Sequence, residues 1–158
     1  MASPTAQAMT IDITKGGNLG ACREFWVKIP GLSAATDCDT ASILYYCLNP
    51  FNEDVVIVEA LANITTEDAQ DGDIDVGLAD DAAGMNSGTE ICDSLVNSAA
   101  GVLRLMAALN GIGVAAPIWR KTGTATDSYL TVKQNADADA AALKWNLILK
   151  CVPLADMK

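Results

Sequence analysis

The sequence predicts an all-β protein, an antiparallel β-sandwich or barrel of about eight to ten strands. Three observations support this prediction. Apolar and polar residues alternate with a period of two in many apolar segments, as in a strand with one buried face. Turn-forming residues interrupt the chain roughly every 8 to 20 residues. No strands alternate with long helical patterns, so a parallel nucleotide-binding sheet is not expected.

The alternation is clearest in the middle of the chain. The even positions of 56–64, Val58 among them, are all apolar. Positions 74, 76 and 78 are apolar too, and they alternate with Asp73 and Asp75. A polar stretch, 65–72, joins the two runs. We therefore predict a central hairpin whose strands each turn one face to the core and the other face, including Asp75, to water.

The whole chain has the size of one domain, at 158 residues. We expect an N-terminal arm with a first short strand over 1–20, and a single β-sandwich domain over 21–158. Pro30-Gly31 has the composition of a turn and should end the second strand. The odd positions of 143–151 are apolar and should face the core. Besides the hairpin, strands are predicted at 10–14, 22–29, 40–48, 101–109, 117–121, 127–134 and 141–152.

Two segments fit more than one structure. Residues 89–100 fit a short helix, because apolar residues recur there every four positions after Thr and Glu. At most one short helix, near 90–99, is expected. Residues 101–109 fit a helix as well, but the glycines around them favour a strand.

Composition excludes several classes of function. The net charge is −10, with 20 acidic and 10 basic residues, and nucleic-acid affinity depends mainly on Lys and Arg. Nucleic-acid binding is therefore not expected. No run approaches the ~20 apolar residues of a membrane span, so no membrane association is expected either. The first residues lack the pattern of a secretion signal, which predicts synthesis in the cytoplasm.

The chain also lacks the side chain that catalysis uses most often. Histidine is absent, which removes the commonest general base and metal ligand. The five cysteines include no Cys-x-x-Cys pair, so zinc and dithiol chemistry are not expected. We interpret Cys47 and Cys151 as small buried apolar residues of strands. The expectation is a protein that is not an enzyme, with no catalytic residues and no cofactor.

A cluster of carboxylates offers a weak metal site. Asp71, Asp73, Asp75 and Asp80 are hard oxygen ligands, of the kind that calcium binds with six to eight oxygens. The spacing lacks the Gly and Glu that a calcium loop requires at its sixth and twelfth positions. The alternation already places Asp73 and Asp75 on the solvent-facing side of a strand. We expect no metal, with calcium at these four residues as the weaker alternative.

The tryptophans could line a ligand-binding face. Trp145 lies on the apolar side of its predicted strand, so core packing is expected for it. For Trp26 and Trp119 the sequence leaves core packing, a subunit interface and a ligand platform open.

Five segments occur in a characteristic order: Asn-Pro-Phe at 49–51, Ile-Asp-Val-Gly-Leu-Ala-Asp-Asp-Ala at 74–82, Ile-Cys-Asp-Ser-Leu-Val at 91–96, Thr-Gly-Thr-Ala-Thr-Asp-Ser-Tyr-Leu at 122–130, and Leu-Lys-Trp-Asn-Leu-Ile-Leu-Lys-Cys-Val at 143–152. In this order they resemble the small jelly-roll structural proteins of tailed bacteriophages, above all the head decoration, or cement, proteins. The resemblance spans about residues 40–152. It implies an antiparallel jelly-roll-like β-sandwich and a homotrimer on the surface of the phage head, bound to the major capsid protein.

We therefore expect a structural virion protein that is made in the host cytoplasm and placed on the capsid surface. Its contacts with the capsid or with other subunits are expected to use the N-terminal arm, over 2–18, and adjacent loops. Met9, Ile11, Trp26 and Trp119 are the candidate interface residues. The alternative is a carbohydrate-binding jelly-roll module of a receptor-binding or tail-fibre protein, which would use Trp26, Trp119, Tyr129 and the carboxylates of 71–81.

Overall fold

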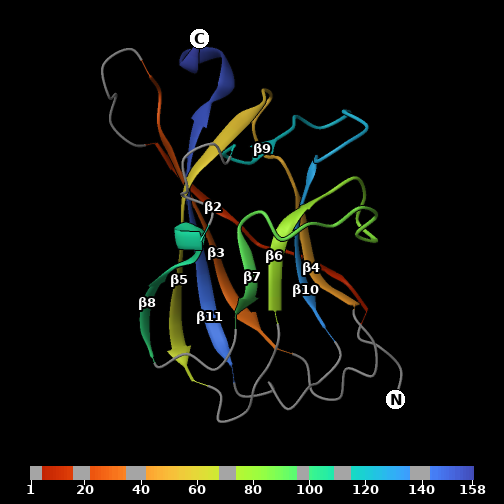
Figure 1. Cartoon of the computed structure of the whole chain (residues 1–158), viewed down its shortest axis with the longest axis vertical. Helices are drawn as coiled ribbons and strands as arrows, with labels where there is room; N and C mark the ends of the chain where they lie inside the picture. Colours follow the sequence, from red (N-terminus) through yellow and green to blue (C-terminus); the bar gives the residue numbers. More distant parts are fainter. Residues whose placement is uncertain are drawn as a thin grey trace.

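A computed structural model describes residues 5–15, 22–34, 42–67, 74–95, 100–108, 115–135 and 143–158. These residues form two curled β-sheets packed face to face, as Figure 1 shows. The all-β prediction is confirmed. In the described part of the chain the helical segments are two single turns of 3-10 helix, η1 (Leu105–Ala108) and η3 (Leu154–Met157).

Each sheet draws its strands from distant parts of the chain. Sheet A has the order β1-β4-β10-β6-β7, and sheet B has the order β2-β3-β11-β5-β8, with β9 also paired to β5. The strands are β1 (Gln7–Ala8), β2 (Asp12–Lys15), β3 (Phe25–Ser33), β4 (Ser42–Leu48), β5 (Val55–Thr66), β6 (Ile74–Ala79), β7 (Cys92–Leu95), β8 (Gly101–Arg104), β9 (Ile118–Trp119), β10 (Tyr129–Gln134) and β11 (Lys144–Pro153).

Eight of these strands pair in a nested order. β3 pairs with β11, β4 with β10, β5 with β8, and β6 with β7, all antiparallel. The chain thus behaves as one long hairpin rolled into two sheets, which is the jelly-roll arrangement of eight strands. The predicted jelly-roll-like β-sandwich is confirmed.

The predicted central hairpin is wrong. β5 belongs to sheet B and pairs with β11, β8 and β9, whereas β6 belongs to sheet A and pairs with β10 and β7. The two strands contribute to one hydrophobic core from different sheets. An alternating pattern identifies the buried face of a strand, but it does not identify the neighbour that completes the ladder.

The core lies between the sheets and contains the apolar odd positions of the last strand, as predicted. Leu143, Trp145, Leu147, Leu149 and Cys151 are all buried. Cys47 of β4 and Cys151 of β11 are buried in the same core, as expected. Burial raises the pKa of each thiol to about 12, so both stay protonated and unreactive at neutral pH.

A β-bulge shifts the alternation within β5. Glu59 pairs with Lys150 and Ile57 pairs with Cys151, which leaves Val58 as an extra residue between the two pairs. Ile57 therefore faces the core, and Val58 is 36% exposed. The prediction that Val58 faces the core is wrong, because one inserted residue reverses the faces of the residues beyond it.

A second irregularity extends β3. Pro30 and Gly31 do not end the strand, which continues to Ser33. They form a bulge opposite Asn146, because Ile29 pairs with Leu147 and Leu32 pairs with Trp145. The amide of Gly31 donates to Asn146 Oδ1 at 3.0 Å, and Gly31 has a positive φ of 71° that suits glycine.

The two ambiguous segments are resolved mostly as strands. Cys92–Leu95 is β7 and pairs with β6, so a helix over these residues is wrong, while 96–99 lie outside the described residues. The strand predicted at 101–109 is confirmed for Gly101–Arg104 and gives way to η1.

The described part of the N-terminal segment contacts both sheets. β1 lies parallel to β4 in sheet A, and β2 lies antiparallel to β3 in sheet B. The first strand with a partner in sheet B covers 12–15 instead of 10–14. Between the two short strands, the amide of Met9 donates to the Tyr46 carbonyl at 2.7 Å, and Met9 and Ile11 pack against the core. Residues 5–15 are thus attached to the sandwich.

Candidate functional site

The β6 part of the outer face of sheet A is covered by the chain itself. The loop between β6 and β7, residues 80–91, folds back over this face: the Gly88 amide donates to the Leu78 carbonyl at 3.0 Å, and the Leu78 amide donates to Glu90 Oε2 at 3.0 Å. A Cβ atom on Gly77 would overlap the Gly88 carbonyl oxygen. Gly77 is therefore the residue that lets the loop approach the strand so closely.

The outer face of sheet B is open. The register places Trp26, Lys150 and Glu59 in one row across β3, β11 and β5. The next row contains Lys28, Ile148, Leu61 and Arg104, from β3 to β8. All of these side chains are partly or fully exposed. We call these two rows the open face.

The open face carries cations in a chain with an acidic surplus. Lys28, Arg104 and Lys150 lie on it with the carboxylate Glu59, and a second carboxylate, Glu24, lies beside Lys150. Lys150 Nζ lies 3.1 Å from Glu24 Oε1 and 5.7 Å from the centre of the Trp26 ring, a cation–π distance. The aromatic ring and the ammonium group therefore hold each other in place and present a mixed apolar and basic surface.

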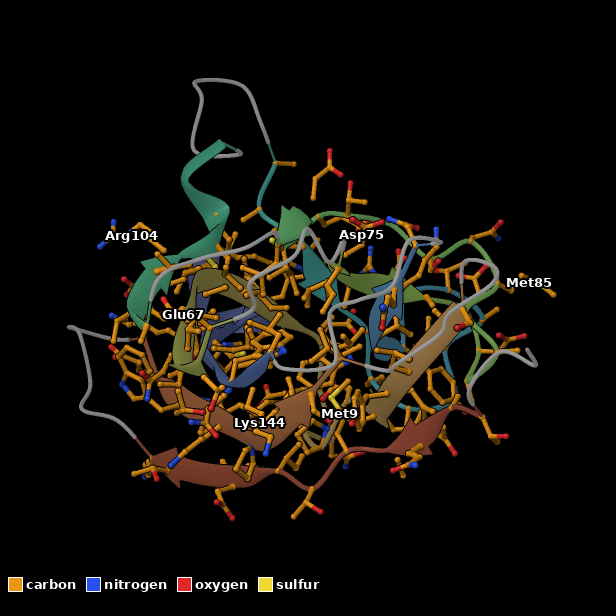
Figure 2. The ribbon with its side chains drawn as sticks, turned by 90° about the horizontal axis from the view of Figure 1, so that it is seen from below. Met9, Glu67, Asp75, Met85, Arg104 and Lys144 are labelled. Atoms are coloured by element: carbon orange, nitrogen blue, oxygen red, sulfur yellow. The ribbon has the colours of Figure 1, made fainter. Side chains whose placement is uncertain are left out.

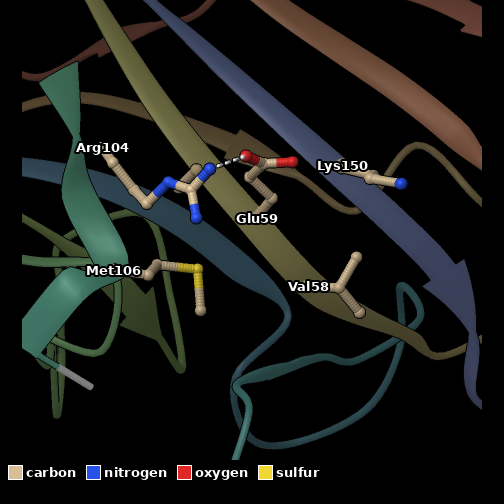
Figure 3. A pocket seen from close by; sticks show the side chains of 6 residues that line it. Val58, Glu59, Arg104, Met106 and Lys150 are labelled. Carbon is tan, nitrogen blue, oxygen red and sulfur yellow. Dashed lines mark ion pairs between the residues drawn. The ribbon is translucent and has the colours of Figure 1, made fainter. Parts of the chain in front are cut away.

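A pocket opens where the open face meets the free edge of β5, between β8 and β9. It has a volume of about 260 Å³ and is lined by Val58, Glu59, Ala60, Arg104, Met106 and Lys150. Figure 3 shows Arg104 and Lys150 on either side of Glu59. Arg104 Nη2 lies 3.2 Å from Glu59 Oε1. We call this hollow the β5–β8 pocket.

The β5–β8 pocket has the chemistry of a binding site for a side chain. Val58, Ala60 and Met106 give it an apolar floor. Arg104 is largely exposed, and only one oxygen of Glu59 pairs with it, so its remaining N–H groups can donate to an incoming carboxylate. An apolar group with a carboxylate beside it fits this arrangement.

A network of ion pairs lies away from the open face. The Arg23 guanidinium donates two hydrogen bonds of 2.9 Å to Glu53, and its Nε donates to Asp156 at 2.9 Å. The Arg23 side chain lowers the pKa of Asp156. The backbone N–H of Lys121 lowers the pKa of Asp54, and Arg120 adds to this effect. These contacts fix the chain end and β9 to the start of β5.

The predicted interface residues lie in different environments. Trp119 is 0% exposed and donates from Nε1 to the Ser128 carbonyl at 3.1 Å, so it packs the core and presents no surface. Met9 and Ile11 are partly buried against the core. Trp26 lies on the open face. Of the four candidates, Trp26 alone belongs to the surface described above.

The carboxylates of the weak metal alternative do not converge where they are described. Asp75 is 5% exposed and accepts from Asn135 Nδ2 at 2.9 Å, so it is not on a wet face. Asp80 accepts from Asn86 Nδ2 and from the Asp127 amide. Asp75 and Asp80 are five residues apart, which corresponds to about 17 Å of extended chain. Asp71 and Asp73 lie outside the described residues, among which no group of three metal-ligating side chains occurs.

The residues proposed for sugar binding do not share a face. Trp26 faces outward from sheet B, whereas Tyr129 pairs with Leu48 and Ala79 in sheet A, and Trp119 is buried. An aromatic platform of these three residues is not assembled.

Sequence reasoning missed the pocket. Its position depends on the bulge at Val58 and on Arg104 and Met106 crossing beside β5. The one available signal was Glu59, the single charged residue in the apolar run 55–62. That signal does not distinguish a bulge from a regular strand.

In the described ranges, the structure contains no helix with the length and apolarity needed to span a bilayer. Comparison of the chain with protein-family models, with curated proteins and with solved structures finds no match.

Proposed function

We propose that this chain is a structural, non-enzymatic virion protein that decorates and stabilises the head of a tailed bacteriophage. It would be made in the host cytoplasm and assemble as a homotrimer on the capsid surface, bound to the major capsid protein. The fold is compatible with this role, since double-sheet jelly rolls serve as viral capsid domains as well as lectin domains. Fold alone does not establish a function, so the proposal depends on the surface.

The observation that carries the proposal is the difference between the two outer faces. Residues 80–91 cover the β6 part of sheet A, whereas the open face of sheet B presents Trp26, Ile148 and Leu61 among ion pairs. The chain as a whole has a net charge of −10. A mixed apolar and basic surface on an acidic protein is typical of a protein-binding surface, because it offers apolar area and attracts acidic partners.

The contact with the capsid is proposed to use the edge formed by β2. All four residues of β2 are exposed, and Ile13 is 45% exposed at the sheet edge. Met9 and Ile11 pack against the core just before it and so anchor this segment to the sandwich. A strand edge held in this way can accept a strand of the capsid protein through backbone hydrogen bonds.

The test is electron cryo-microscopy of phage heads from a lysate that contains the protein, compared with heads from a lysate in which its gene is deleted. We expect extra density of a jelly-roll trimer on the outside of the first heads. Adding the purified protein to the bare heads should restore the density and raise the temperature at which the heads rupture. Heads without any such density would contradict the proposal.

Ile13→Asp tests the proposed contact edge, because a carboxylate at this position would oppose strand docking. We expect its binding to bare heads to fall at least tenfold in a co-sedimentation assay. Met157→Asp, a change of another exposed apolar residue, should bind like the unchanged protein. Equal loss in both variants would argue against β2 as the contact.

A further inference from the structure

The tip of the β6–β7 loop presents an apolar side chain above two carboxylates. Met85 is 60% exposed. Its amide donates to Asp81 Oδ1 at 3.0 Å, and its carbonyl accepts from the Asp80 amide at 2.9 Å. Gly84 and Asn86, on either side of Met85, both have positive φ angles, which make the turn tight. Met85 is therefore a fixed apolar projection with an acidic base.

This projection and the β5–β8 pocket lie on opposite sides of the molecule. Figure 2 shows Met85 at one side and Arg104 of the pocket at the other. One chain cannot bring its own loop into its own pocket. Each copy thus offers one projection and one pocket to its neighbours.

The two surfaces complement each other in shape. The pocket volume of about 260 Å³ exceeds the roughly 150 Å³ of a cavity that accepts benzene. Val58, Ala60 and Met106 line it with apolar atoms. A methionine side chain is unbranched and adapts to irregular apolar hollows, so the Met85 side chain suits this one.

The surfaces also complement each other in charge. Residues 80–93 contain four carboxylates and no basic residue, and Asp80 and Asp81 lie directly beside Met85. At the side of the pocket, the Arg104 side chain is 63% exposed and keeps N–H groups that Glu59 does not use, whereas Lys150 is already paired with Glu24. Opposite charges around an apolar contact favour one partner orientation and suppress others.

We propose that Met85 and the acidic loop of one copy dock into the β5–β8 pocket of a second copy, head to tail. This inference rests on the proposed function only for the expected number of subunits, which is three. A two-fold contact uses the same patch twice and ends at a dimer, whereas a ring of three requires two different patches on every subunit. The loop tip and the pocket are two such patches.

The first test measures the mass of the full chain in solution by multi-angle light scattering at micromolar concentration. The unchanged protein should have three times the 16.5 kDa of one chain. Met85→Asp should reduce the mass to one chain, because the shorter and charged side chain loses the apolar contact with Val58, Ala60 and Met106. Met157→Asp, a change of another exposed methionine, should keep the mass of three chains.

The second test changes the pocket and then mixes the variants. Val58→Asp should also yield single chains, while Met157→Asp, the control of the first test, should not. A mixture of Met85→Asp and Val58→Asp retains one intact pocket and one intact loop per pair. It should therefore form a 1:1 dimer that grows no further, with a mass of two chains.

Thermal melting by circular dichroism checks that each variant is folded; if Val58→Asp is not, Arg104→Glu replaces it. A multimer that neither substitution disrupts, or a mixture that stays monomeric, overturns this interface but not the proposed function. A monomeric unchanged protein overturns the interface and the homotrimer together. Bare heads that fail to acquire density, with the mass results as expected, overturn the proposed function alone.

Discussion

The outer faces of the two sheets of this sandwich differ in how far the chain itself covers them. On sheet A, Gly77, Thr131 and Asp75 point away from the core and are nevertheless buried. On sheet B, Leu61 and Ile148 occupy equivalent outward positions and remain partly exposed. The difference shows that a period-two pattern determines which face meets the core, while a covering loop determines whether the other face meets water.

The cover on sheet A is held by backbone hydrogen bonds along β6. The Ile91 amide donates to the Val76 carbonyl at 3.1 Å, next to the bonds that join Gly88 and Glu90 to Leu78. The open face of sheet B relies on exposed ion pairs, such as Arg104 with Glu59. Substitutions on the two faces should therefore lower the free energy of unfolding by unequal amounts.

The largest effect is expected from Gly77→Ala. The added methyl group would overlap the Gly88 carbonyl oxygen and a Glu90 carboxylate oxygen, so the cover must shift. We expect a loss of about 3 kcal/mol in the free energy of unfolding, measured by urea denaturation. Gly31→Ala on β3 meets no neighbouring atom but has a positive φ, and it should cost about 1 kcal/mol. Equal costs would mean that the cover is loosely held.

An intermediate effect is expected from Glu90→Ala. This substitution removes the acceptor of the Leu78 amide beneath the cover, and an unsatisfied buried donor costs about 1–3 kcal/mol. Glu90→Gln keeps an acceptor oxygen and should recover most of the loss. Glu59→Ala on the open face breaks an exposed pair and should cost less than about 1 kcal/mol. If thermal melting ranked Glu59→Ala above Glu90→Ala, the contrast between the faces would be wrong.

The smallest effect is expected from Asp54→Asn, which changes the residue directly before β5. The pKa of Asp54 is lowered by the Lys121 amide and by Arg120. A lowered pKa stabilises the fold above the ordinary value of about 4 and ceases to do so as the pH falls through the lowered pKa. The variant should be less stable by under about 1 kcal/mol at pH 7, and the gap should close in acid. A gap that persists to the lowest pH of the folded state would exclude this origin.

The sequence predicted much of the fold because each strand carries its own local signal. The apolar odd positions of the last strand indicated five core residues, and all five are buried. The candidate site could not be predicted in the same way. Trp119 and Trp26 both lie in strands beside a β-branched residue, Ile118 and Val27, yet one is in the core and the other on the open face. Their local sequences do not encode which side of a sheet each one faces after a bulge or a crossing.

By itself, the sequence determined the class of the fold, the approximate positions of the strands, the acidic charge and the lack of histidine chemistry, because composition and alternation are local properties. The tertiary structure alone decided the rest. It assigned β5 and β6 to different sheets, turned Val58 outward, and laid residues 80–91 over Gly77. Each of these outcomes depends on pairing between residues far apart in the chain, where hydrogen-bond register and close backbone contact select one arrangement among many with the same alternation.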